Sequence, residues 1–258
     1  MKLFIKKILN TNSSIKIRNI LGIRSVPMSI NNINSFASVS DAFCWRTDNG
    51  FSTVFKYSDI LNLFYKTRNS QVELRFYTKE NKFIKNLVIE NLDYSNELII
   101  NSDLLDGLKD YGSFYVYHLT TDNINDENII SNKCYVGYSI NNSLHSFVHG
   151  NTLARFIKIN NHKNLEQTDI VKLTFFKNQK YKIQNFFRNL DKSELFFVNP
   201  TSKKIRFSID NKNYSLLGGC SIVVETTEKE SIEIKSNCLF FRPVIFNYKG
   251  EYIDTYHG

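Results

Sequence analysis

The chain has 258 residues, a formal charge of +8 and a hydrophobic fraction of 42%. Its aromatic content of 14%, with 21 Phe and 14 Tyr, excludes a disordered chain, which lacks such residues. The positive charge indicates a basic solvated surface. We expect no nucleic-acid partner, because the sequence has no zinc-finger spacing, no RNA-recognition signature and no helix-turn-helix pattern.

We expect residues 1–33, in which apolar and cationic residues alternate, to form a basic N-terminal arm. Lys6 and Lys7 interrupt the apolar run, which argues against a signal peptide. Such an arm either packs on the body through its apolar side or lies on an anionic membrane surface. No stretch of 18 apolar residues occurs, so we expect a cytoplasmic protein that the arm could bring into peripheral contact with the inner membrane.

Short stretches of alternating apolar and polar residues predict strands along most of the chain. Examples are VELRF at 72–76, IRFSID at 205–210 and SIEIK at 231–235. This period of two is typical of antiparallel sheets with one solvated side. The segments KENK, NPTSKK and DNKN supply turns between strands, and SDILNLFYK and NSDLLDGLKD each predict one short helix with a serine N-cap.

An internal similarity suggests that the chain contains one module twice. The segment from Thr53 aligns without a gap with the segment from Thr174, at an offset of 174 − 53 = 121 residues. Because both copies are expected to be strands with turns, we predict an all-β fold. It would consist of two tandem antiparallel β-sandwiches of jelly-roll type, over residues 34–158 and 168–258, joined by a polar linker at 159–169.

Sequence motifs for catalysis or metal binding are missing. No GxSxG segment occurs, and LGGCS at 217–221 lacks the lysine of a phosphate-binding loop. The cysteines are not in CxxC spacing and have apolar neighbours, so we expect buried free thiols. We therefore predict no cofactor and no metal. One catalytic alternative is Asp41 and Asp48 as the carboxylate pair of a glycosidase.

The segment SLHSFVHGN at 143–151 places His145 and His149 four residues apart, before Asn151. In a strand the two histidines share a face but lie about 13 Å apart, at about 3.3 Å per residue, which is too far to bind one zinc ion. In a helical turn they would be neighbours. The strand-like YVGYSI before the segment and Gly150 after it favour an extended segment, with Phe147 on the same face as both histidines.

Several further polar residues are candidates for ligand binding, each with a structural alternative. Trp45, Arg46 and Asp48 in FCWRTDNGF offer a ring for stacking on a sugar and groups for its hydroxyls, or else a core tryptophan and an ion pair at a turn. His118 ends SFYVYH and is either a rim residue of the core or a ligand group. The remaining candidates are Arg242, which could face a groove beside Pro243, and His257, which could close over a pocket with Asp254 or lie in a surface tail.

Four segments carry a resemblance: SVSDAFCWR, GSFYVYHL, YVGYSINNSLHSFVHGN and FRPVIFNYKGEYIDTYHG. They resemble uncharacterised bacterial proteins that are built from β-sandwich repeats and encoded among surface-polysaccharide genes. The modules are also similar, more distantly, to the jelly-roll sandwich of the sensory rhodopsin transducer family. The resemblance implies a surface-glycan context but no reaction.

These features support three hypotheses about function. The first is a non-catalytic protein of bacterial surface-glycan assembly that binds a carbohydrate or a glycan-assembly protein. The second is an enzyme acting on a sugar or a sugar-linked group, in which His118, His145, His149 and His257 line one cleft. The third is a structural or adaptor protein that binds a protein partner through its sheet surfaces.

Overall fold

The computed structural model describes most of the chain from residue 37 onwards. The described ranges are 37–122, 124, 129–131, 134–158, 166–168, 170–171, 173–174, 178–184, 190–226, 231–238 and 241–258, with six isolated positions before residue 22. Almost all of the predicted arm at 1–33 and most of the predicted linker at 159–169 therefore lie outside the described residues. Within them, 58% of the residues are in strands and 5% in helices, so the all-β class agrees with the sequence-based prediction.

The described elements are one short helix of the main body and a series of strands. The helix is α3 (Ile60–Tyr65). The strands are β1 (Ala37–Asp41), β2 (Phe43–Arg46), β3 (Phe51–Tyr57), β4 (Ser70–Thr78), β5 (Phe83–Ile89), β6 (Asn96–Ile100), β7 (Tyr111–Thr120), β8 (Ile129–Ser131), β9 (Tyr135–Ile140), β10 (Ser146–Val148), β11 (Leu153–Lys158), β12 (Glu166–Gln167), β13 (Gln179–Gln184), β14 (Lys192–Val198), β15 (Ile205–Ile209), β16 (Lys212–Leu216), β17 (Ser221–Thr226), β18 (Ser231–Ser236), β19 (Val244–Lys249) and β20 (Tyr252–His257).

These strands form five separate sheets of four strands each. We name each sheet by one member: the β1 sheet (β12-β11-β1-β8), the β3 sheet (β10-β9-β3-β6), the β7 sheet (β2-β7-β4-β5), the β14 sheet (β17-β14-β19-β20) and the β15 sheet (β13-β18-β15-β16). The five small sheets are arranged as in a five-bladed β-propeller. The prediction of two tandem jelly-roll sandwiches is therefore wrong. The period of two in the sequence identifies strands, but it does not say which strands pair.

The internal repeat does not correspond to repeated pairing. At an offset of 121 residues β4 corresponds to β14 and β5 to β15, and all four are strands. However, β4 pairs with β5 in one sheet, whereas β14 and β15 belong to different sheets. The helix α3 would correspond to the strand β13. The matching residues thus reflect a shared alternation of apolar and polar residues, not two copies of one module.

Local sequence signals explain many of the elements. The side chains of Val72, Leu74 and Phe76 on β4 are fully buried, as their alternation predicts. The turn residues Asp210 and Asn211 have positive φ and join β15 to β16. The predicted helix at SDILNLFYK is present, but its N-cap is the following Asp59, which accepts from the Asn62 amide, and not the serine. The other predicted helix, at 101–110, is a series of turns.

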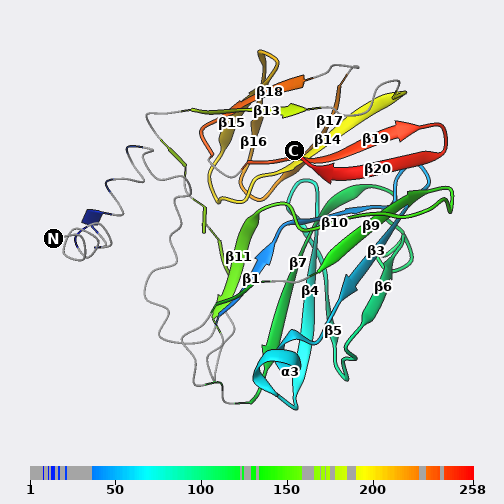
Figure 1. The fold of residues 1–258 in the computed structure, drawn as a ribbon, viewed down its shortest axis with the longest axis vertical. Coiled ribbons are helices and arrows are strands. Elements are labelled where there is room, and N and C mark those ends of the chain that lie inside the picture. The colour runs from blue at the N-terminus through cyan, green and yellow to red at the C-terminus, as the bar shows by residue number, and fades with distance from the viewer. Residues whose placement is uncertain are drawn as a thin grey trace.

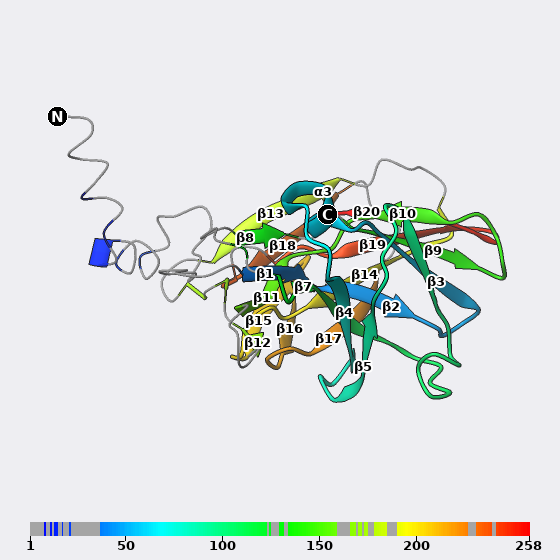
Figure 2. The same ribbon diagram turned by 90° about the horizontal axis from the view of Figure 1, so that it is seen from below.

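The main apolar core connects four of the five sheets. Phe55 and Phe114 from the first half of the chain lie in the same buried cluster as Phe196, Val244 and Phe246 from the second half. A second cluster lies between the β14 and β15 sheets. In Figures 1 and 2 the β3 sheet and the β1 sheet lie on opposite sides of β4 and β7. No helix among the described residues is long and apolar enough to cross a membrane.

Candidate functional site

The outer face of the β3 sheet carries a strip of exposed rings. Phe147 on β10 is 41% exposed and Tyr135 on β9 is 48% exposed. His149 packs against Tyr135 with 4.3 Å between the ring centroids and 38° between the ring planes, and the ring centroids of His145 and Phe147 lie 6.1 Å apart. The Lys56 ammonium lies 5.0 Å from the centre of the Phe147 ring. We call these five residues the aromatic strip.

Strand pairing brings these rings together on one face. The backbone turns at Asn141 and Asn142, both with positive φ, and joins β9 to β10 in the antiparallel register that pairs Phe147 with Gly137. Tyr135, two residues before Gly137 on β9, pairs with Lys56 on β3, so these side chains lie on the same face. The extended segment and the turn agree with the sequence-based expectation for residues 141–151.

Gly137 lets the Phe147 ring lie close to the sheet. A Cβ atom at this position would lie 2.5 Å from the Phe147 ring, nearer than real side-chain contacts allow. The ring therefore occupies the space that a side chain on β9 would fill. A flat, half-exposed ring flanked by imidazoles and an ammonium offers both stacking and hydrogen bonding to a ligand.

The strip ends beside the C-terminal strand. The Thr255 amide donates to the Ser146 hydroxyl at 2.8 Å, which holds β20 against β10. Burial, together with smaller electrostatic effects of the nearby His149 and Arg242, lowers the pKa of His257 to about 4. These contacts show that three of the predicted site residues, His149, Arg242 and His257, lie near one another. His145 belongs to the same strip.

Trp45, Arg46 and Asp48 lie in the interior or at its edge, away from the strip. The Trp45 ring is fully buried, and its Nε1 donates to the Tyr77 carbonyl at 2.9 Å. The Arg46 guanidinium binds both carboxylate oxygens of Asp48, at 2.9 and 2.7 Å, and binds Glu194 at 2.5 Å. The structure thus places a tryptophan in the core and an ion pair at a turn. This is the structural alternative that was given for these residues.

The Arg46–Glu194 pair joins the two halves of the chain electrostatically. Burial alone would raise the pKa of Glu194, but Arg46 and a hydrogen bond from the Tyr248 hydroxyl outweigh it and hold the pKa below its usual value. The guanidinium also lies 3.9 Å from the centre of the Phe51 ring. The pair is therefore part of the folded framework.

His118 and Asn151 are also buried. His118 has no exposed surface, and neither ring nitrogen has a hydrogen-bond partner among the described residues. Burial lowers the pKa of His118 to about 3. Both side-chain polar atoms of Asn151 likewise lack a partner in the described part of the chain, although its backbone amide donates to the Ala42 carbonyl. Neither side chain belongs to the strip.

The structure does not bring together Asp41 and Asp48, the carboxylate pair suggested for a glycosidase. Asp41 and Asp48 lie at opposite ends of β2, which alone spans about 10 Å, and Asp48 is held by Arg46. Within the described ranges, no three His, Cys, Asp or Glu side chains gather as a metal site.

The four cysteines are not in disulfides. Cys44 is fully buried, and burial raises the pKa of its thiol far above the usual value. Cys134 and Cys238 are buried as well, whereas Cys220 is only partly buried, so the expectation of buried free thiols holds for three of the four. Burial argues against a nucleophilic role for Cys44.

Sequence reasoning found the histidines of the strip but missed Tyr135 and Lys56. Tyr135 could have been found by extending the alternation on β9, since Tyr135, Gly137 and Ser139 share one face. Lys56 could not have been found this way, because its place beside Tyr135 depends on the pairing of β3 with β9, two strands that are far apart in the sequence.

Comparison with known proteins does not assign a family. No protein-family model matches the sequence, and no curated protein matches it. Two crystal structures described as glycosyl hydrolase family 2 members of Bacteroides cellulosilyticus align with 90% of the chain, at 8% and 11% identity and TM-scores of 0.20 and 0.15. The chain spans 28% and 30% of their lengths. TM-scores this low establish neither a shared fold nor a shared activity.

Proposed function

We propose that this protein binds carbohydrate, without acting on it, through the aromatic strip. The observation that carries the proposal is the pair of half-exposed rings, Phe147 and Tyr135, on one open sheet face beside His145, His149 and Lys56. Aromatic faces stack on the apolar faces of sugar rings, and imidazoles hydrogen-bond to sugar hydroxyls. Arg242 and His257 extend the polar groups beyond His149.

The basic character of the strip favours an acidic glycan over a neutral one. Lys56 is about half exposed, although Glu97 lies 3.1 Å from its ammonium group and partly neutralises it. Arg242 is exposed beside His257. The resemblance to proteins of surface-polysaccharide genes supports a role in surface-glycan assembly, with the glycan or a glycan-assembly protein as the partner.

Binding to a panel of bacterial surface polysaccharides, measured by affinity electrophoresis, tests the proposal. We expect the unaltered protein to be retarded by at least one acidic polysaccharide and Phe147→Ala to lose most of that retardation. The matched control is Phe83→Ala, which removes a ring that is 59% exposed on β5, outside the strip. Phe83→Ala should bind as the unaltered protein does.

Three outcomes would contradict the proposal. Equal loss of binding in Phe147→Ala and Phe83→Ala would show that the strip is not the site. Release of reducing ends from a retained polysaccharide would show an enzyme instead. A panel that gives no retardation would favour the adaptor hypothesis.

A further inference from the structure

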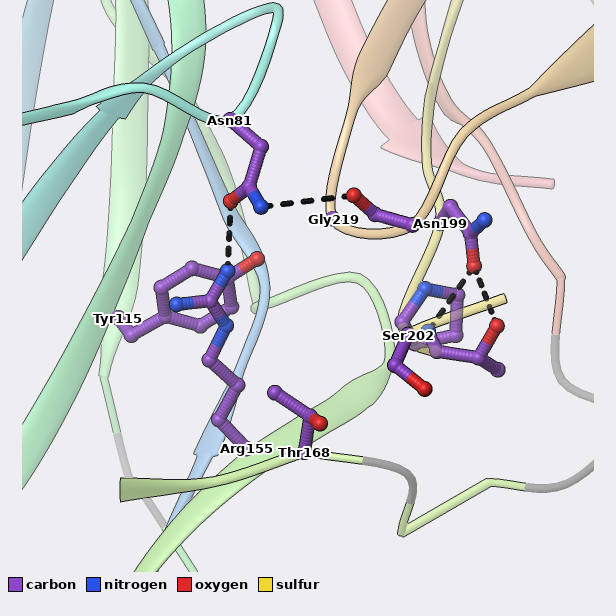
Figure 3. A pocket seen from close by; sticks show the side chains of 10 residues that line it. Asn81, Tyr115, Arg155, Thr168, Asn199, Ser202 and Gly219 are labelled. Carbon is purple, nitrogen blue, oxygen red and sulfur yellow. Dashed lines mark hydrogen bonds between the residues drawn. The ribbon is translucent and has the colours of Figure 1, made fainter. Parts of the chain in front are cut away.

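A separate pocket lies on the other side of the β7 sheet from the aromatic strip. It has a volume of about 190 Å³ and is lined by the turn between β4 and β5, by β7 and β11, and by the loops before β15 and β17. Figure 3 shows Arg155 and Tyr115 on one side of it and Asn199 and Ser202 on the other, with Asn81 and Gly219 at its rim. Ligand sites for drug-sized molecules measure roughly 300–1,000 Å³, so this pocket suits a smaller ligand.

The Arg155 guanidinium is held firmly in this pocket. Only 6% of its side chain is exposed, and it lies 3.9 Å from the centre of the Tyr115 ring and 4.3 Å from that of Tyr77. Its Nη2 donates to Asn81 Oδ1 at 2.8 Å. Because stacking and this hydrogen bond fix the plane of the guanidinium, little entropy is lost when a ligand binds to it.

The Glu166 carboxylate pairs with Arg155 only at a long distance and is shared with other side chains. Glu166 lies 3.3 Å from Arg155 Nη1 through both of its oxygens, longer than the 2.7–2.9 Å usual for charge-assisted bonds. The same oxygens accept shorter hydrogen bonds from the hydroxyls of Tyr117, at 2.5 Å, and Tyr77, at 3.1 Å. The hydrogen bonds that Arg155 forms with described residues use Nη1 and Nη2, which leaves the Nε–H donor for a ligand.

A second, independent observation points to a ligand. Tyr115 is fully buried, and its hydroxyl has no hydrogen-bond partner among the described residues. In Figure 3 the hydroxyl end of its ring points into the space between Arg155 and the Asn199 side. An unpaired buried hydroxyl is costly in free energy, and a ligand oxygen in the pocket would pair it.

We propose that this pocket binds the carboxylate group of a small ligand, either an acidic sugar unit or a free hydroxy acid. Arg155 Nε–H and the Tyr115 hydroxyl are both donors, so they match a group that only accepts. The site is distinct from the aromatic strip and does not depend on the proposed glycan binding there.

Isothermal titration with glucuronate, lactate, glucose and phosphate tests this proposal on the full chain. We expect glucuronate or lactate to bind saturably and glucose, which lacks the carboxylate, to bind at least tenfold more weakly. Tighter binding of glucuronate than of lactate would assign the site to a sugar acid, and the reverse order to a free hydroxy acid.

Tyr115→Phe is the decisive variant, because it removes only the unpaired hydroxyl. It should weaken binding of the preferred acid about two- to tenfold while leaving the melting temperature unchanged or higher. The matched control is Tyr138→Phe, which removes a buried hydroxyl that donates to the Cys44 carbonyl. This control should lower the melting temperature and leave binding unchanged.

Unaltered binding in Tyr115→Phe would overturn the proposal, as would equal affinity for glucose or for phosphate, or no saturable binding of either acid. Phe147→Ala, tested in the same titration, should bind the acid as the unaltered protein does. Its behaviour separates failure of this pocket from failure of the aromatic strip.

Discussion

At the scale of single residues, the core of this protein contains buried polar groups of two kinds. His118 is neutral in the core and its ring nitrogens have no hydrogen-bond partner among the described residues, whereas Arg46 and Glu194 are charged and paired there. The two cases respond differently to substitution. Removing an unpaired polar group is neutral or stabilising, whereas removing one member of a buried pair leaves the other without compensation.

His118→Leu should make the protein less sensitive to acid. The pKa of His118 is about 3 in the folded state and 6.5 in the unfolded state, so between these values the unfolded state binds more protons. Stability therefore falls as the pH drops below 6.5, by up to about 1.4 kcal/mol per pH unit, and this contribution is missing in the variant. Urea unfolding at pH 7.5, 6.0 and 5.0 measures the free energy of unfolding of both proteins. If it changed with pH equally in the two, the lowered pKa of His118 would be contradicted.

Glu194→Gln should destabilise the fold by about 1–3 kcal/mol at pH 7, because Arg46 loses one of its two charged partners and keeps Asp48. The folded-state pKa of Glu194 is lowered, so its stabilising contribution is present above pH 4.5 and is lost as the pH falls through the folded-state value. Chemical denaturation measures both effects. The control is Glu97→Gln on the exposed pair with Lys56, which should change stability little.

His145→Gln and His149→Gln should fold normally and bind glycan less well. Both histidines are exposed, and surface substitutions usually change stability by less than about 0.5 kcal/mol. Each lost neutral hydrogen bond to a ligand should weaken binding by roughly 0.5–1.5 kcal/mol. Thermal melting and affinity electrophoresis measure the two quantities. Unfolding in either variant would show a structural histidine.

At the scale of elements, close packing between strands depends on small residues. Gly112 on β7 pairs with Trp45 on β2 and with Thr78 on β4, in the middle of the β7 sheet. A Cβ atom there would lie 2.2 Å from the Tyr77 carbonyl oxygen and 2.7 Å from the Trp45 ring. The carbonyl belongs to the backbone and cannot move away without disturbing the sheet.

Gly112→Ala should therefore destabilise the protein by about 1–3 kcal/mol, the usual cost of overpacking. Gly250→Ala is the control. Its φ of 57° strains an alanine by about 1 kcal/mol, but no atom lies within 4 Å of the added Cβ. If urea unfolding showed equal destabilisation of the two variants, the prediction would be wrong. The neighbours of Gly112 would then have moved to make room for the added Cβ atom.

At the scale of the whole molecule, the largest core cluster joins the two halves of the chain. Phe51 on β3 meets Phe246 on β19 edge to face, with centroids 5.7 Å apart, and Tyr138 on β9 meets Phe246 at 4.9 Å. Separating the halves would expose these rings to water. The shared cluster bears on the division of the chain that was predicted from the sequence, into residues 34–158 and 168–258.

We expect residues 34–158 and 168–258, expressed separately, to be unfolded or aggregated, and the full chain to melt in one transition. The reason is that each fragment exposes aromatic residues of the shared core at a cost of about 25 cal/mol per Å². Circular dichroism and calorimetry check both outcomes. A folded 34–158 fragment with the full chain's melting temperature would contradict a shared core.

The sequence by itself determined the class of the fold and the location of many strands. Alternation of side chains is a local property, so the buried residues of β4, β15 and β18 could be read from it. The same local reasoning predicted an extended segment around His145 and His149. It also predicted free thiols, because each cysteine lies near apolar or aromatic residues and no two are in CxxC spacing.

Only the tertiary structure decided how the strands pair and which side chains meet. Pairing joins residues that are distant in the sequence, and many strands of similar pattern can pair in many ways. For this reason the sequence suggested a repeat of two sandwiches where five small sheets form, and it suggested ligand roles for Trp45 and His118, which are buried. The pocket at Arg155 and Tyr115 arises from the same cause: its groups come from strands and loops that the sequence keeps far apart.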